Sequence, residues 1–162
     1  MRERPPRTFE DLAVGEVRES RRLTVSQSDM INFARQYDPQ WFHTDPDAAK
    51  ESTFGELVAS GIYNMALVRL LDHEINGDID YVCGVGWDDL RLKVAVKAND
   101  TVFVRSQILE LKPSTSGAKR GTAITRYALI NQRGDEAVYF TSINLVYTRA
   151  ARQKPKDCRP QK

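Results

Sequence analysis

The sequence contains little of what metal sites and disulfide-stabilised folds require. Its 162 residues include two cysteines, Cys83 and Cys158, and two histidines, His43 and His73. Two cysteines in such different contexts do not form a disulfide framework, and together with two histidines they give no metal-ligand spacing. We therefore expect a metal-free protein in a reducing compartment.

Long apolar runs and a strong charge of one sign are also missing. No stretch approaches the roughly 18 apolar residues of a membrane-spanning helix, and the first residues lack the apolar core of a secretory signal. These absences predict a cytoplasmic protein with no membrane partner. The net charge of +2 does not favour nucleic acid, and the basic residues near both ends are not interleaved with aromatic side chains.

The residues that are present suit one compact domain. Hydrophobic residues make up 41% of the chain and charged residues 28%, which is ordinary for a globular protein, and the length allows one good core. We expect this domain to span residues 1–149. Residues 150–162 are basic, contain two prolines and lack apolar periodicity, so we expect a disordered tail there.

The order of the expected elements indicates an α+β fold. A capping box at Ser26 predicts a helix over about residues 27–37, and a second, largely apolar helix is expected from Gly61 to about His73. A helix that is apolar over much of its surface, followed by antiparallel strands, predicts a sheet folded around that helix. The strands are expected over residues 16–25 (weakly), 80–85, 87–96, 101–111, 122–130 and 137–147.

The segment between the two helices has the composition of an active site. Asp38 and His43 lie five positions apart, and Pro39 prevents a regular helix between them, so their side chains can converge on one water molecule. A carboxylate and an imidazole can together hold and activate that water. Gly61 opens the apolar helix, and its free N–H suits a polarised carbonyl oxygen.

Each of these residues also has an ordinary structural interpretation. Asp38 suits a turn before a proline, His43 suits a half-buried hydrogen-bonded histidine, and Asp45 followed by Pro46 suits a helix start. For any one residue the structural interpretation is favoured. The order and spacing of the set favour a site.

The stretch over residues 33–71 resembles the MaoC-like dehydratase family, which includes the (R)-specific enoyl-CoA hydratases. The family pattern is an Asp, a His after four further residues, an Asp-Pro two residues on, and a Gly that opens the central helix; Asp38, His43, Asp45 and Gly61 match it. The resemblance covers roughly residues 8–149 and implies a single hotdog domain, an antiparallel sheet wrapped around a central apolar helix.

The resemblance implies a lyase that reversibly hydrates a 2-enoyl thioester to a 3-hydroxyacyl thioester, as in fatty acid metabolism. The carbonyl oxygen of the thioester would bind the N–H of Gly61, while a water held by Asp38 and His43 adds to C3. No cofactor is implied beyond the thioester substrate itself. The sequence leaves open which of the two side chains takes the proton, the acyl chain length and branching, the direction, and whether the carrier is coenzyme A or an acyl carrier protein.

The sequence differs from the family pattern at residues close to the motif. Gln40-Trp41 replaces a frequent Asn-Pro, and Ser60 stands where a His is common. Large aromatic side chains between the catalytic residues are expected to form a pocket wall. Arg91, Lys93 and Lys97 are candidate contacts for the phosphates of the carrier. The expected substrate-binding residues are Trp41, Phe42, Ser60, Ile62 and Arg91.

Two other functions use the same fold. A hotdog thioesterase would hydrolyse the same class of substrate, and a non-catalytic module would only bind acyl-CoA; the Asp38, His43 and Gly61 set favours the hydratase. A curved sheet also leaves an open edge strand, and such edges are usually covered. We therefore expect a homodimer or a higher oligomer, the state that the resemblance also implies.

Overall fold

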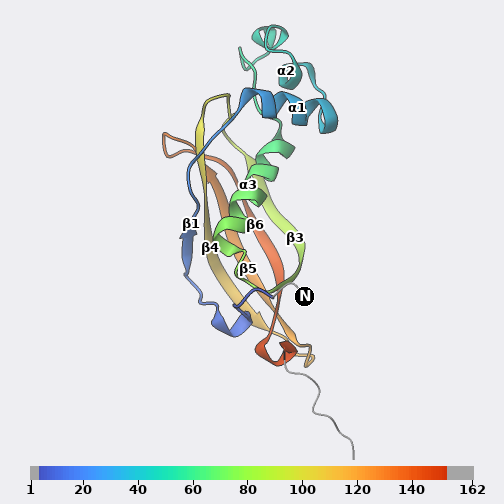
Figure 1. Ribbon diagram of the computed structural model, residues 1–162, viewed down its shortest axis with the longest axis vertical. Helices are drawn as coiled ribbons and strands as arrows, with labels where there is room; N and C mark the ends of the chain where they lie inside the picture. The colour runs from blue at the N-terminus through green and yellow to red at the C-terminus, as the bar shows by residue number, and fades with distance from the viewer. Residues whose placement is uncertain (1–3, 153–162) are drawn as a thin grey trace, which may run out of the picture.

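The core of the molecule is a six-stranded antiparallel sheet. The structure is a computed structural model that describes residues 4–152. The strands follow the order β1-β4-β5-β6-β3, and β2 pairs separately with β4 (Figure 1). The expected α+β class is confirmed. The strands are β1 (Val17–Glu19), β2 (Leu23–Thr24), β3 (Tyr81–Leu92), β4 (Thr101–Pro113), β5 (Arg120–Ile130) and β6 (Glu136–Tyr147).

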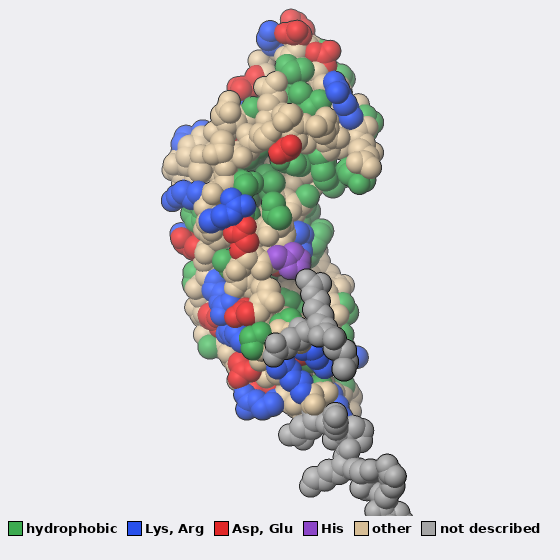
Figure 2. Space-filling model, in the orientation of Figure 1, with side chains coloured by type: hydrophobic (Ala, Val, Ile, Leu, Met, Phe, Trp, Pro, Cys, Tyr) green, Lys and Arg blue, Asp and Glu red, His purple; other side chains and the backbone are tan. Residues whose placement is uncertain are grey.

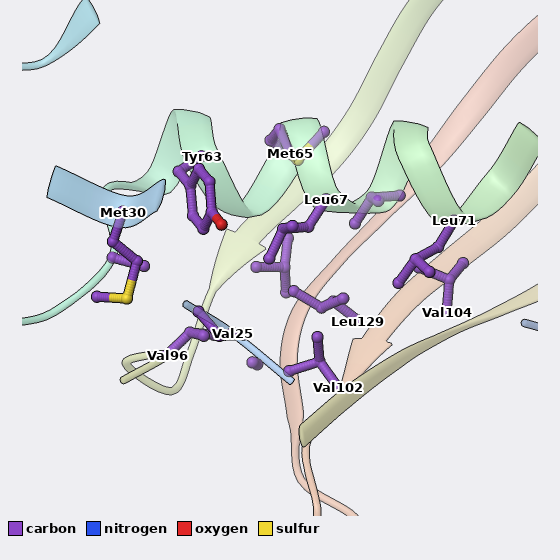
Figure 3. Packing of buried hydrophobic residues seen from close by; sticks show 14 of the residues in the cluster. Val25, Met30, Tyr63, Met65, Leu67, Leu71, Val96, Val102, Val104 and Leu129 are labelled. Atoms are coloured by element: carbon purple, nitrogen blue, oxygen red, sulfur yellow. The ribbon is translucent and has the colours of Figure 1, made fainter. Parts of the chain in front are cut away.

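Helix α3 (Gly61–Asn76) lies along the sheet, which curves around it (Figure 1). It begins at Ser60, whose side chain accepts a hydrogen bond from the Tyr63 N–H at 3.1 Å, and it runs three residues past the predicted end at His73. One face packs onto the strands in the main core (Figure 3). That core joins Val25, Met30, Tyr63, Leu67, Leu71, Val102, Val104 and Leu129, among others.

Strand β3 replaces the two strands that were predicted over residues 80–85 and 87–96. It runs continuously, and its pairing with β6 shifts register at three places. Such bulges bend a strand without ending it. At the last of them Asp89 has φ of +52°, a left-handed conformation that Asp tolerates. The predicted strand over 16–25 is likewise divided, into β1 and β2, which both pair with β4.

The remaining helices lie at the two ends of the sheet, with α1, α2 and η2 at one end and η1 and η3 at the other (Figure 1). Helices α1 and α2 cover the N-terminal end of α3 (Figure 1), and the predicted cap of α1 is confirmed, since the Ser26 side chain accepts from the Asp29 N–H. A 3-10 helix follows Asp45 and Pro46, the residues that suited a helix start, and the Asp45 carboxylate accepts from two backbone N–H groups. These elements are α1 (Gln27–Tyr37), α2 (Trp41–Thr44) and the 3-10 helices η1 (Phe9–Asp11), η2 (Ala48–Glu51) and η3 (Arg149–Arg152).

The two ends of the described chain meet at Asp80. This buried carboxylate lies 2.8 Å from the Arg4 guanidinium and 2.9 Å from that of Arg152. Residues 150–152 of the predicted tail therefore belong to η3 and are held against the domain. The rest of the predicted tail lies outside the described residues.

Within residues 4–152, no helix is both long and apolar enough to cross a membrane.

Candidate active site

The chain bends sharply where the catalytic residues were predicted. Asp38 ends α1 with a φ of −154° and a ψ of 68°, conformations outside the helix, and Pro39 follows it. Two residues later α2 begins, and it carries His43. The bend brings the His43 Nε2 to 3.8 Å from the Asp38 Oδ2. The predicted convergence of these two side chains therefore has a local cause.

Hydrogen bonds fix the orientation of both side chains. The His43 Nδ1 lies 2.7 Å from the Val58 carbonyl oxygen, and because a carbonyl oxygen only accepts, Nδ1 carries the hydrogen. In the neutral ring the Nε2 facing Asp38 is then an acceptor. The other Asp38 oxygen, Oδ1, accepts from Gln40 Nε2 at 3.3 Å. Two acceptors at this separation suit a water that donates one hydrogen to each.

Gly61 presents its backbone at the first position of α3. The helix supplies no acceptor for an N–H at this position, and the N-terminal end of a helix attracts a partly negative oxygen. A Cβ at Gly61 would lie 2.6 Å from the Leu92 Cδ1 of strand β3. The missing side chain thus allows Leu92 to pack directly over the helix start.

A cavity of about 710 Å³ extends from this cluster along α3. Asp38, Gln40 and His43 form its polar end. Figure 2 shows the molecule hollowed below the part formed by α1 and α2, with hydrophobic side chains around the hollow. One wall is formed by α3 residues at helical spacing, namely Gly61, Ile62, Met65, Ala66 and Arg69.

The opposite wall comes from β3. Trp87, Leu90 and Leu92 line it. Side chains alternate between the two faces of a regular strand, so residues 87 and 90 would point to opposite faces. The bulge at Asp89 corrects this alternation and brings all three to the cavity. The irregularity in β3 therefore shapes the apolar wall.

A second cavity, of about 290 Å³, adjoins the same cluster. His43, Gly61 and Leu92 line both cavities, so the two spaces meet at the predicted catalytic residues. Asn64 and Lys93 supply polar groups to the second cavity. A molecule that reacts at Gly61 can extend in two directions.

The structure brings together most of the predicted catalytic and binding residues. Asp38, His43, Gly61 and Ile62 line the larger cavity, and Phe42 lines the smaller one. Ser60 is buried beneath the helix start, where it caps α3 and lines neither cavity.

Trp41 and Arg91 lie apart from both cavities. The Trp41 side chain is 48% exposed and packs edge-on against Phe42, with ring centroids 5.4 Å apart. The Arg91 side chain is 58% exposed and donates to the carbonyl of its neighbour Leu90. The structure does not place either residue in a cavity wall.

Sequence reasoning missed several of the lining residues. Met65 is buried and also lines the larger cavity. Arg69 could have been found, since it lies eight positions after Gly61 and so on the same helix stripe. Leu90 and Leu92 could not, because an irregular strand brings them there.

Comparisons with known proteins identify the family of this chain. The family model for the MaoC like domain matches residues 9–132. The chain is 29% identical over 129 residues to 3-hydroxyacyl-thioester dehydratase Z of Mycobacterium tuberculosis, covering 74% of this chain and 85% of that protein. It is 28% identical over 107 residues to the uncharacterized protein YdeM of Bacillus subtilis, covering 65% and 75%.

Among solved structures, a MaoC-like dehydratase from Rhodospirillum rubrum superimposes with a TM-score of 0.82 at 31% identity. The similarity covers 88% of this chain and 97% of that one. The sheet wrapped around α3 is the hotdog fold that the sequence predicted.

Proposed function

Because the chain belongs to the MaoC-like dehydratase family, we propose that it reversibly hydrates a 2-enoyl thioester, carried on coenzyme A, to the 3-hydroxyacyl thioester. The observation that carries the proposal is that the Asp38 and His43 pair lines the same cavity as Gly61, the first residue of α3, and that His43 and Gly61 also line a second cavity. The similarity to a 3-hydroxyacyl-thioester dehydratase supports the same reaction class.

The proposed chemistry follows from the hydrogen-bonding capacity of these groups. A water donating to Asp38 and to His43 Nε2 directs its oxygen lone pair at C3 of the substrate. As the C–O bond forms, the double-bond electrons move towards the thioester carbonyl, whose oxygen is stabilised by the Gly61 N–H. The pair removes one proton from the water and returns a proton to C2. Dehydration is the same sequence in reverse.

Each of the two cavities holds a different part of the substrate. The thioester lies at Gly61, the acyl chain occupies the larger, apolar cavity, and the carrier arm leaves through the smaller one. The amide of Asn64 and the ammonium of Lys93 suit the amides and phosphates of that arm.

An assay with crotonyl-CoA tests the proposal against its two alternatives. Hydration removes the enoyl absorbance without releasing thiol, whereas a thioesterase releases free thiol. A binding module neither removes the enoyl absorbance nor releases thiol, but calorimetry would still detect its binding of the thioester. Loss of absorbance that is abolished in Asp38→Asn supports the hydratase. Thiol release alone, or binding alone across enoyl-CoAs of several chain lengths, would overturn it.

A further inference from the structure

The larger cavity ends at a single basic side chain. Gly61, Met65 and Arg69 are four residues apart on α3, so they form one stripe along the cavity wall. Eight residues of helix separate Gly61 from Arg69 by about 12 Å. Of the described residues that line this cavity, Arg69 is the only cation, and apolar side chains of α3 and β3 lie between it and the catalytic cluster.

A buried carboxylate holds Arg69 in place. Its Nη1 lies 2.5 Å from Oδ2 of Asp72, a residue only 2% exposed. The other Asp72 oxygen accepts from Asn76 Nδ2 at 2.8 Å, and the same nitrogen donates to Ser106 Oγ of strand β4 at 3.0 Å. Asp72 is thus tied to the sheet as well as to its own helix.

Holding Arg69 with a buried carboxylate does not favour stability by itself, which indicates that the guanidinium serves a function. Burying a carboxylate is energetically unfavourable, and apolar side chains of similar volume often serve stability as well or better. Burial, and then the nearby charge of Asp72, raise the pKa of Tyr81 to about 12. The Asp72 carboxylate therefore lies within a poorly solvated cluster under α3, while the Arg69 side chain that it pairs with is partly exposed.

The guanidinium keeps hydrogen-bonding capacity for a ligand. It has five N–H donors in a fixed plane. Asp72 takes one, and Nη2 lies 3.5 Å from the ring of His73. The side chain is 41% exposed, so the remaining donors are accessible from the cavity. A planar group of this kind binds carboxylates through paired, charge-assisted hydrogen bonds.

We propose that the preferred substrate carries a carboxylate on its acyl chain, the monothioester of an unsaturated dicarboxylic acid, which Arg69 binds at the far end of the larger cavity. This inference rests on the proposed function for the position of the thioester. Arg69 is a specificity-determining residue, and Asp72 is a positioning residue that acts through it.

The kinetic test compares substrates that differ only at the far end of the chain. The values of kcat/KM are measured for 2-hexenedioyl-CoA and 2-octenedioyl-CoA, thioesterified at one end, and for 2-hexenoyl-CoA and 2-octenoyl-CoA. We expect the carboxylated member of at least one pair to be favoured about tenfold or more. The neutral methyl ester of the same diacid should lose that advantage.

Variants assign the preference to Arg69. Arg69→Met should lower kcat/KM for the carboxylated substrate by about tenfold or more while leaving the uncharged one equal or better. Asp72→Asn keeps the volume and should raise KM for the carboxylated substrate with little change in kcat. Arg21→Met is the matched control, because Arg21 pairs with Glu74 of α3 outside the cavity and should leave the ratio unchanged.

Binding of saturated analogues keeps the inference separate from the proposed reaction. Calorimetry with adipyl-CoA and hexanoyl-CoA should show the same preference, and its loss in Arg69→Met, even in a protein that turned over neither enoyl thioester. Equal affinity for the two analogues, or a preference that survives Arg69→Met, would overturn the inference while leaving the proposed hydration intact.

Discussion

At the residue scale, Asp38 and His43 can be changed without removing their structural contacts. Asp38→Asn keeps the shape of the side chain, and His43→Asn keeps an N–H close to the position of Nδ1, where it can reach the Val58 carbonyl. Each change removes an acid/base group, so we expect turnover of an enoyl thioester to fall by on the order of a hundredfold or more. Melting temperatures close to that of the wild type would show that the fold is retained.

Trp41→Ala is the matched control for these two variants. Trp41 lies between them in the sequence, yet it is largely exposed and lines neither cavity. We expect its turnover, its chain-length preference and its melting temperature to stay close to the wild-type values. A normal rate in Asp38→Asn and His43→Asn, or a greater loss in Trp41→Ala than in either, would contradict the assignment of the site.

How well a site residue could be predicted depends on what positions it. The convergence of Asp38 and His43 results from a bend over a few residues around Pro39, so the spacing in the sequence was informative. Gly61 was predictable because a helix start has a local signature. Trp41 and Arg91 were expected near the substrate from their sequence neighbours alone, and a side chain next to a site residue can point away from the site.

At the element scale, the start of α3 is fixed by its cap. Ser60→Ala removes the acceptor for the Tyr63 N–H, and a lost cap of this kind costs about 0.5–2 kcal/mol. Ser26→Ala removes the equivalent bond at the start of α1, which is more exposed. Both variants should melt at lower temperature, as thermal unfolding can measure.

Only the cap of α3 lies next to the proposed oxyanion donor. Ser60→Ala should therefore also lower kcat, because fraying of the first turn moves the Gly61 N–H. Ser26→Ala should leave kcat unchanged. Equal kcat values in the two variants would show that the position of Gly61 does not depend on the Ser60 side chain.

The bounds of the most regular helices and strands were the ones best predicted from the sequence. The periodic helix α3 and the alternating strands β4, β5 and β6 lie close to their expected bounds, because each pattern reports on one buried face. Strand β3 was expected as two partly alternating strands, with a break at Gly86. A register shift between Gly84 and Gly86 lies at that break, and it depends on pairing with β6, which is distant in the sequence.

At the scale of the whole molecule, acidic residues in ion pairs make stability depend on pH. Hydrogen bonds from Thr8 lower the pKa of Asp11 to about 2, while Arg7 lowers the pKa of Glu16 and Arg126 that of Glu136. A carboxyl whose pKa is lower in the folded state stabilises the fold above its unfolded pKa of about 4. That contribution is lost as the pH falls through the folded pKa values.

We therefore expect the melting temperature to fall between about pH 5 and about pH 2. Glu136→Gln should lower the melting temperature at neutral pH and make the acid decline shallower, because it removes a two-bond pair with Arg126. Glu110→Gln, an exposed change on β4, is the control and should do neither. A melting temperature that rises on acidification would contradict the direction of these pKa shifts.

One edge of the sheet has features of an interface. Strand β3 ends the strand order, and no other strand within residues 4–152 pairs with its outer edge. Several large apolar side chains of β3 are exposed, and an unpaired apolar edge invites pairing with another chain. These exposed side chains are Val85, Trp87, Leu90 and Leu92.

The last prediction is that two copies of the chain associate through β3. Light scattering should then give at least twice the chain mass of 18.4 kDa. Val85→Lys places a charge on this half-exposed edge and should yield monomers, whereas Val17→Lys, equally exposed on the opposite edge strand β1, should not. Because β3 also forms one wall of the larger cavity, the monomeric variant should lose turnover as well. A wild-type monomer with full activity would contradict this role of β3.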